Sequence, residues 1–257
     1  MLKILTLGDV VGTAAIAHLR THLWSVRTKL GADCVIANGE NASDIHGLTP
    51  TDAEALLDCG IDLLTMGNHT YGRRELYGFL DHDPRIIRPA NFPPAAPGQG
   101  YTTLNIDGYR ILVINIQGQV YMDTPADPFD TVERILQKEK GDYDFAVMDI
   151  HAEATSEKLA LARVFDGRIA AMFGTHTHVP TADEQILPRG SGYITDLGMT
   201  GPVDGILGTN ADAVIAKFRT RMPQRFTVAC GSVRAHGALF EIDPSAGKCV
   251  SLKRITF

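Results

Sequence analysis

Five apolar stretches of this sequence are each followed by side chains that can bind a metal ion. Each stretch has the length and composition of a buried strand. Functional groups in open α/β sheets collect outside the carboxyl ends of the strands, so we expect these side chains to meet from distant parts of the chain. They are Asp9 after LKILTLG, Glu40 and Asn41 after CVIANG, Asn68 and His69 after IDLLTMG, His151 after YDFAVMDI, and His176 and His178 after IAAMFGT.

The donor atoms of this set indicate the metals and the chemistry to expect. Carboxylates, side-chain amides and imidazoles, without a thiolate, suit Mn, Fe, Zn or Co. About seven ligands are too many for one tetrahedral ion and fit two divalent or trivalent ions, which usually share a bridging carboxylate. Asp9 or Glu40 could form that bridge. Two divalent ions and two carboxylates would leave the pocket at about +2, which attracts a phosphate ester, and would lower the pKa of bound water to about 7.

Each residue, taken singly, has a structural alternative. An Asp after a strand is more often a turn or helix cap than a ligand, and a lone His is usually solvated or hydrogen-bonded. His176 and His178 lie on one side only if their segment is extended. We assign the structural role to the other histidines, of which His46 deserves a closer look because it follows Asn41 in a loop: His18, His22, His46, His82 and His236.

The elements that must position these residues alternate between strands and helices in the first half of the chain. This alternation predicts βαβ units and a mostly parallel sheet. We predict strands over 2–7, 34–37, 61–66, 143–150 and 169–173, and helices over 13–30, 50–59, 73–80, 130–140, 156–165 and 210–221.

Three further segments complete the expected fold. Residues 83–100 contain five prolines and two glycines and predict a loop. Asp107-Gly108 is a hairpin signal within 101–116. Residues 225–257 are expected to form three strands, which would build a second sheet with the hairpin. Because no linker or repeat interrupts the chain, we predict one domain over residues 1–257.

Composition narrows the class of protein. Of the 257 residues, 44% are hydrophobic and 21% are charged, which is typical of a soluble globular protein. The formal charge of −6 argues against a DNA-binding protein, although a local cation could still attract a phosphate. The four cysteines form no C-x-x-C pair, so we expect reduced thiols. With no apolar run long enough for a bilayer, we expect a cytoplasmic protein.

The motifs resemble those of a known superfamily. GDVVG at 8–12, GENAS at 39–43, GNH at 67–69, His151 and GTHTH at 174–178 are similar to the motifs of calcineurin-like metallophosphoesterases. The longer segments TMGNHT, RPANFP, DIHAEATSEKLAL, GTHTHVPTAD, ITDLGMTGP and DGILG resemble the bacterial YmdB-like branch. The resemblance covers nearly the whole chain and implies a four-layer α/β/β/α sandwich with mixed sheets.

The resemblance also implies a role for each site residue. Glu40 would bridge two metal ions, and His69 would be the catalytic histidine near the leaving group. The remaining ligands would be Asp9 and His178 at the first metal, and Asn68, His151 and His176 at the second.

Three positions depart from the superfamily pattern. Val11 stands where the first motif usually has a histidine, so Asn41 is the nearest candidate to complete the first metal site. The bridging residue is Glu40, where an aspartate is common. Thr70 follows His69 where a carboxylate is frequent, which leaves open what orients the His69 ring.

The implied activity is hydrolysis of a small phosphodiester, 2′,3′-cyclic nucleotides in particular. A hydroxide held by the two metals would attack in line, and His69 would protonate the departing alkoxide. A broader phosphomonoesterase, a nuclease on short RNA, and a regulatory metal-binding scaffold with weak activity remain alternatives.

Phe92, Tyr193 and Thr200 with Gly201 lie in expected loops that could border a base or ribose. The chain shows no P-loop, no G-x-S-x-G elbow and no basic and aromatic stripe for single-stranded nucleic acid. Homo-oligomer formation is a further expectation.

Overall fold

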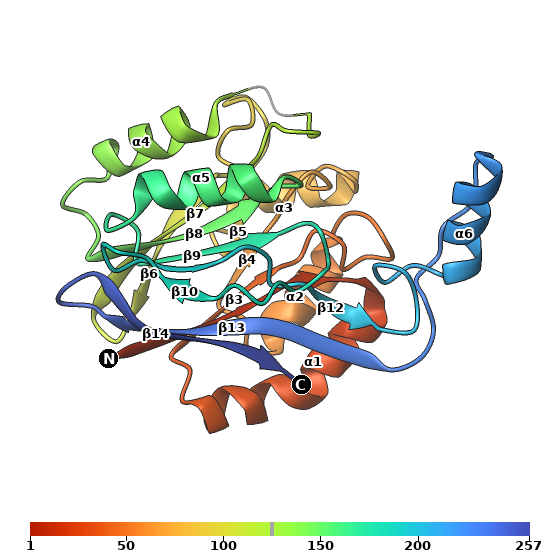
Figure 1. The fold of residues 1–257 in the computed structure, drawn as a ribbon, viewed down its shortest axis with the longest axis horizontal. Helices are drawn as coiled ribbons and strands as arrows, with labels where there is room; N and C mark the ends of the chain where they lie inside the picture. The colour runs from red at the N-terminus through yellow and green to blue at the C-terminus, as the bar shows by residue number, and fades with distance from the viewer. Residues whose placement is uncertain (124–125) are drawn as a thin grey trace.

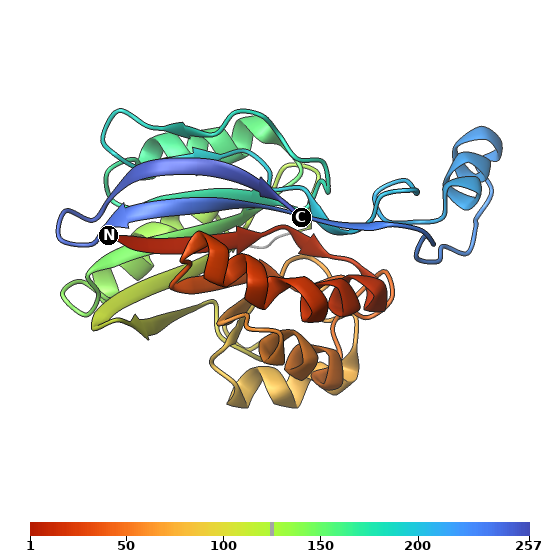
Figure 2. The same ribbon diagram turned by 90° about the horizontal axis from the view of Figure 1, so that it is seen from below.

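The computed structural model describes residues 1–123 and 126–257 of the chain. The described strands form two mixed sheets that lie face to face (Figures 1 and 2). The first sheet has the order β2-β12-β13-β1-β3-β4-β5, and β14 also pairs with β13. Its strands are β1 (Leu2–Leu7), β2 (Asp9–Val10), β3 (Cys34–Asn38), β4 (Leu63–Thr65), β5 (Ile86–Ile87), β12 (Met199–Pro202), β13 (Val233–Asp243) and β14 (Lys248–Thr256).

The second sheet has the order β10-β11-β9-β8-β7-β6. Strands β7, β8, β9 and β11 run parallel, while β6 and β10 pair antiparallel at the two edges. The strands are β6 (Tyr101–Ile106), β7 (Tyr109–Gln117), β8 (Phe145–His151), β9 (Ala171–Thr175), β10 (Gln185–Ile186) and β11 (Gly192–Ile194).

Local signals set the bounds of the helices. Gly31 ends the first helix in the left-handed conformation at φ 64°, and its N–H reaches the carbonyls of the last turn. The Thr49 hydroxyl accepts from the Asp52 N–H at the start of the second helix. The helices are α1 (Gly12–Leu30), α2 (Pro50–Asp58), the 3₁₀ turn η1 (Arg74–Leu76), α3 (Tyr77–His82), α4 (Pro128–Lys138), α5 (Thr155–Phe165) and α6 (Ala211–Thr220).

Three clusters of buried apolar side chains separate four layers. Leu19 of α1 and Leu56 of α2 belong to the cluster against the outer face of the first sheet. Phe173 and Phe240 meet between the two sheets. Leu161 of α5 belongs to the cluster that α4 and α5 form with the second sheet. The predicted α/β/β/α sandwich with mixed sheets is therefore confirmed. One domain over residues 1–257 stays a prediction.

Two expectations about the second sheet are wrong. The hairpin β6–β7 does join the second sheet, but β13 and β14 belong to the first one, because β13 pairs with β1 over Leu2–Leu7. The 225–257 segment also contributes two strands instead of three. Before β13, the only β-bridge of this segment joins Val228 to Thr209. The predicted helix 73–80 is divided into η1 and α3.

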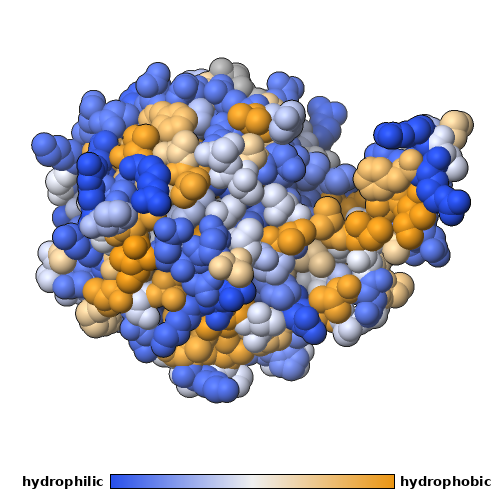
Figure 3. All heavy atoms as spheres, viewed as in Figure 1, coloured by the Kyte–Doolittle hydropathy of each residue, from blue (hydrophilic) through white to orange (hydrophobic). Residues whose placement is uncertain are grey.

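Residues 203–232 form an arm that leaves the sandwich between β12 and β13 and carries α6 (Figures 1 and 2). Val214 is the one residue of α6 that is buried, while Ile215 and Phe218 are exposed. Figure 3 shows apolar surface along this arm. No helix in the described ranges is both long and apolar enough to cross a membrane.

Candidate metal centre

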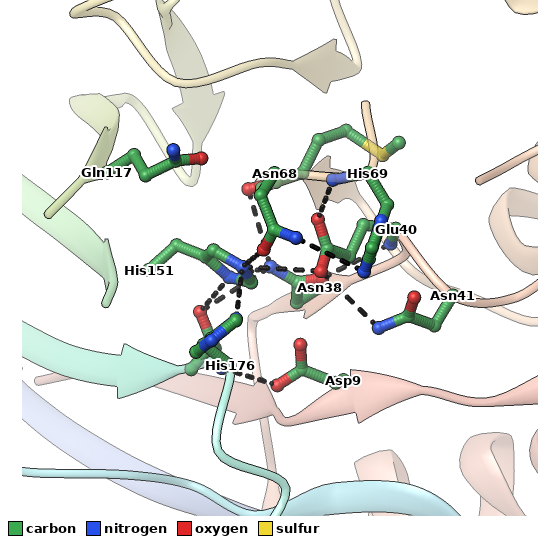
Figure 4. Close-up of polar contacts among 12 residues, drawn as sticks. Asp9, Asn38, Glu40, Asn41, Asn68, His69, Gln117, His151 and His176 are labelled. Carbon is green, nitrogen blue, oxygen red and sulfur yellow. Dashed lines mark hydrogen bonds and ion pairs between the residues drawn. The ribbon is translucent and has the colours of Figure 1, made fainter. Parts of the chain in front are cut away.

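The eight predicted site residues lie together at the carboxyl ends of strands from both sheets. Figure 4 labels all of them except His178. Each approaches another member of the set to 3.7 Å or less. Parallel strands explain this convergence, because their carboxyl ends share an edge. By element, Asp9 follows β1, Glu40 and Asn41 follow β3, Asn68 and His69 follow β4, His151 ends β8, and His176 and His178 follow β9.

One group of donors surrounds the Nε2 atom of His151. This atom lies 3.2 Å from Glu40 Oε1, 2.9 Å from Asn68 Oδ1 and 3.2 Å from His176 Nδ1. Donor atoms of Glu40, His151 and His176 all lie within 4.8 Å of one another. These residues, with Asn68, can therefore hold one metal ion. Gly67 lies so close that a Cβ there would approach the His151 ring to 2.2 Å.

A second group lies on the other side of Glu40. His178 Nε2 is 3.7 Å from Asp9 Oδ1 and 3.3 Å from Asn41 Nδ2, and that amide is 3.4 Å from Glu40 Oε1. Asp9 Oδ1 and Asn41 Oδ1 are buried without a hydrogen-bond partner. Such an unsatisfied buried atom costs about 1–3 kcal/mol, more when it is charged. A cation bound here would relieve that cost.

Without a metal, the buried groups hold protons unevenly. Burial raises the pKa of Asp9, with a partial offset from His178. Burial also acts upward on Glu40, but His151 and His69 outweigh it and lower that pKa to about 2. For His151, burial acts downward, but Glu40 and Asp9 outweigh it and raise the pKa to about 9. The pocket thus favours a positive charge beside its carboxylates, as a metal site does.

A buried chain of hydroxyl and carboxylate groups fixes the His151 ring. Thr175 Oγ1 donates to Asp149 Oδ1 at 2.7 Å and therefore accepts from His151 Nδ1 at 2.9 Å. Thr65 Oγ1 donates to the other oxygen of Asp149 at 2.5 Å. This arrangement leaves Nε2 of His151 as the atom that faces the site. Sequence reasoning missed Asp149 and Thr175, although both lie next to predicted ligands.

The loop after β9 is held by a buried ion pair. His176 and His178 both have positive φ, at 98° and 65°, a conformation that favours glycine. Lys158 Nζ donates to Thr175 O at 2.8 Å and to Asp196 Oδ2 at 2.7 Å. Asp196 also accepts from the N–H of Thr177 at 3.2 Å. Lys158 and Asp196 were also missed, because a lysine in an amphipathic helix usually faces solvent.

The two imidazoles of this loop are oriented separately. His178 Nδ1 lies 3.1 Å from the carbonyl of Leu207, which leaves Nε2 toward Asp9. His176 Nδ1 faces His151, while its Nε2 lies 3.1 Å from Glu153 Oε2. Burial, together with His151, lowers the pKa of His176 to about 3. The His176 ring is thus presented as a neutral donor, and each of the two rings turns a defined nitrogen toward the site.

His69 lies at the edge of the predicted metal-binding groups. Its backbone N–H donates to Glu40 Oε2 at 2.8 Å, and its Nε2 is 3.1 Å from the Asn68 amide nitrogen. The His46 ring packs against it with the centroids 4.1 Å apart. Thr70 turns away and donates to the carbonyl of Gly67. His46 and Asn68 therefore orient the ring, and burial lowers its pKa.

The expected base-binding residues fare differently. Phe92 borders a cavity that Asn68 and His69 also line. Tyr193 does not, because it is fully buried in β11 with its hydroxyl 3.0 Å from Thr195 Oγ1. Thr200 and Gly201 are buried within β12 rather than placed in a loop. The role proposed for these last three residues is thus incorrect.

The donor set fits divalent transition metals. It offers carboxylate, amide and imidazole atoms, orphaned buried oxygens and no thiolate. The four-layer sandwich, with such a cluster between the carboxyl ends of its two sheets, defines a metallophosphoesterase.

Comparison with known proteins identifies the family. The model of YmdB-like proteins matches residues 5–255, and the chain belongs to this family. It is 43% identical over 254 residues to a 2′,3′-cyclic-nucleotide 2′-phosphodiesterase of Bacillus subtilis, covering 99% of this chain and 96% of the relative. A solved hypothetical protein from Thermus thermophilus has a TM-score of 0.94 at 38% identity, covering 100% of this chain and 99% of that one. A solved phosphatase from Mycoplasma pneumoniae has a TM-score of 0.94 at 33% identity, with 100% and 93% covered.

Proposed function

We propose that this protein is a metal-dependent phosphodiesterase that hydrolyses small cyclic nucleotides, with 2′,3′-cyclic nucleoside monophosphates as the expected substrates. The observation that carries the proposal is the pair of orphaned buried oxygens, Asp9 Oδ1 and Asn41 Oδ1, beside the cluster around His151 Nε2. One cation beside Asp9 and Asn41 would satisfy the two orphaned oxygens, and a second cation would be held by the cluster around His151 Nε2. The activity named for the Bacillus subtilis relative supports the substrate class.

We assign the donors to two ions of Fe, Mn or Zn. Glu40 is the bridge, because its Oε1 lies between His151 Nε2 at 3.2 Å and the Asn41 amide at 3.4 Å. The two metal ions, when bound, supply positive charge for the phosphate and lower the pKa of a bound water. Asp9, Asn41 and His178 would hold the first ion, and Asn68, His151 and His176 would hold the second.

His69 is assigned the proton transfer to the leaving group. Its bond to Glu40 and its contact with His46 keep the ring beside the ligands without making it one of them. Because burial lowers the pKa of the ring, its protonated form is a stronger acid than an exposed histidine. The proton would pass to the ribose oxygen released when the P–O bond breaks.

The test combines metal analysis with one substitution. Purified protein should bind about two equivalents of Mn or Fe per chain, and a chelator should abolish turnover of 2′,3′-cyclic AMP. His69→Ala should lower kcat by about 10²–10⁴ while leaving the metal content unchanged. His22→Ala, on the exposed surface of α1, is the matched control and should retain activity.

The other outcomes overturn specific parts of the proposal. Loss of metal from His69→Ala would make this residue a ligand instead of an acid. Faster turnover of 4-nitrophenyl phosphate than of the cyclic nucleotide would indicate a phosphomonoesterase, and internal cleavage of RNA a nuclease. One metal equivalent or none, with an intact fold, would indicate a regulatory scaffold.

A further inference from the structure

The metal centre borders a cleft that is made of two neighbouring cavities. The cavity that contains His69, His176 and His178 has a volume of about 490 Å³. A neighbouring cavity of about 400 Å³ shares Ile45, His46 and Phe226 with it as lining. The two cavities thus adjoin each other between the body and the base of the arm, and together they are called the cleft below. Each has a volume typical of a site for a small ligand.

Cations from separate segments line this cleft. Lys217 of α6 borders the first cavity, and its Nζ lies 4.9 Å from the centroid of the Phe226 ring. Arg225 borders the second cavity. Among the described residues, neither has a carboxylate within ion-pair distance, and both are exposed.

The opposite wall belongs to the body. Arg73 lies there and is held by Asp44 Oδ2 at 2.9 Å and by the carbonyls of Ser43 and His46. Its ion pair with the exposed Asp44 contributes little binding free energy in water. The guanidinium therefore remains beside the cavity and can contact a ligand there. The cleft therefore has cations on both walls and an aromatic ring, Phe226, between its two parts.

These cations would attract a second negative charge. A cyclic mononucleotide has one phosphate, and the metal centre takes it. The next phosphodiester of a nucleic-acid strand would supply charge for Lys217, Arg225 and Arg73, and its base could pack on Phe226. The net charge of −6 restricts this attraction to the cleft and disfavours a long polyanion along the surface.

We propose that this cleft binds the nucleotide that precedes a terminal 2′,3′-cyclic phosphate, so that the substrate class extends to short oligoribonucleotides with this end. The proposal rests on the proposed function. Water forms the new P–O bond, one ribose P–O bond breaks, and the released ribose oxygen takes a proton. The strand keeps a terminal phosphomonoester, and no internal bond is cleaved.

The experiment compares two substrates of the metal-loaded protein, 2′,3′-cyclic AMP and a tetraribonucleotide ending in 2′,3′-cyclic phosphate. We expect kcat/KM to be at least about tenfold higher for the tetranucleotide, mainly through KM, which corresponds to one or two phosphate contacts. The Lys217→Gln/Arg225→Gln variant should reduce this ratio to about one. The control Arg219→Gln/Lys253→Gln removes two exposed cations that do not line the cleft and should keep the ratio.

Salt provides a second measurement. The advantage of the tetranucleotide should decline as KCl rises, with a log–log slope of about −0.7 for each phosphate neutralised, and the cleft variant should show a flatter slope. Equal kcat/KM values for the two substrates, or a ratio that survives in the cleft variant, would overturn the proposal.

Failure of the proposed function is distinguishable from failure of the cleft. If 2′,3′-cyclic AMP is not turned over, the hydrolase assignment fails. The cleft is then tested by the fluorescence anisotropy of a labelled tetranucleotide with a 3′-phosphate. Weaker binding by the cleft variant than by the control variant supports the subsite, and equal binding by the two variants refutes it.

Discussion

Replacing Lys158 with methionine tests whether the buried ion pair holds the metal-ligand loop. Lys158 is fully buried, and its Nζ contacts Asp196 Oδ2 at 2.7 Å and Thr175 O at 2.8 Å. Removing one member of a buried pair costs about 3–5 kcal/mol, because the other charge stays buried. Asp196 would still accept hydrogen bonds from the backbone N–H groups of Thr177 and Gly198. We therefore expect the lower end of that range, about 3 kcal/mol of unfolding free energy.

Urea unfolding of the metal-free protein measures this cost. Lys140→Met, at an exposed lysine, is the control and should change the stability by no more than about 0.5 kcal/mol. Adding Asp196→Asn to Lys158→Met removes the unpaired charge, so the double variant should lose at least about 2 kcal/mol less than the sum of the two single variants. A cost below about 1 kcal/mol for Lys158→Met, or additive losses, would refute the reasoning.

The same substitution should reach the metal centre. Thr175 precedes His176, and Asp196 holds the N–H of Thr177, so the ion pair fixes the backbone on both sides of one ligand. We expect metal affinity to fall by about 10–100-fold in Lys158→Met, as for other residues that orient ligands. A competition titration with a chelating dye measures it. Unchanged affinity in a folded variant would limit the pair to a role in stability.

Two further predictions concern His151. In the metal-free protein its pKa is raised to about 9, so the ring is protonated at pH 7.5 and must release a proton when metal binds at Nε2. Calorimetry of metal binding in two buffers of different ionisation enthalpy should detect this proton release as a difference between the two binding enthalpies. The release should disappear as the pH rises through about 9, because the ring is then already neutral. A binding enthalpy that does not depend on the buffer would contradict the prediction. Thr175→Val breaks the link from His151 to Asp149 and should weaken metal binding by about 10–100-fold. Thr102→Val, on β6 at the sheet edge, is its control, and equal affinities of the two variants would argue against the link.

The sequence predicts the convergence of the site residues because the signal is local and repeated. An apolar run fixes a buried strand, and a polar residue at its end can lie only at the carboxyl edge of the sheet. Asp9, Glu40 and His151 follow this rule in three strands of two different sheets. The helices were predictable for a similar reason. Gly31 ends α1 and Thr49 begins α2 through contacts with residues close by in the sequence.

The missed features depend on contacts between distant segments. β13 pairs with β1 across more than two hundred residues, and nothing in its own pattern selects that partner over the hairpin. Lys158 and Asp196 are 38 residues apart and are recognisable as a pair only after β9 and α5 are packed. The cleft is a similar case. Lys217, Arg225 and Phe226 belong to one basic and aromatic stretch of the sequence, 217–226, but only the fold places that stretch opposite Arg73.

The loop after β9 shows why such a network is required. Glycine would adopt positive φ at 176 and 178 without strain, but glycine offers no donor atom, whereas a non-glycine residue there costs on the order of 1–3 kcal/mol. The backbone N–H of His176 donates to Asp9 Oδ2 at 3.0 Å, so the same turn that positions two imidazoles also fixes a carboxylate. Apolar side chains in place of Lys158 and Asp196 could stabilise the protein equally well. Only directional bonds such as those of Lys158 and Asp196 can also hold the backbone in this conformation, which ties the strain of the loop to its ligands.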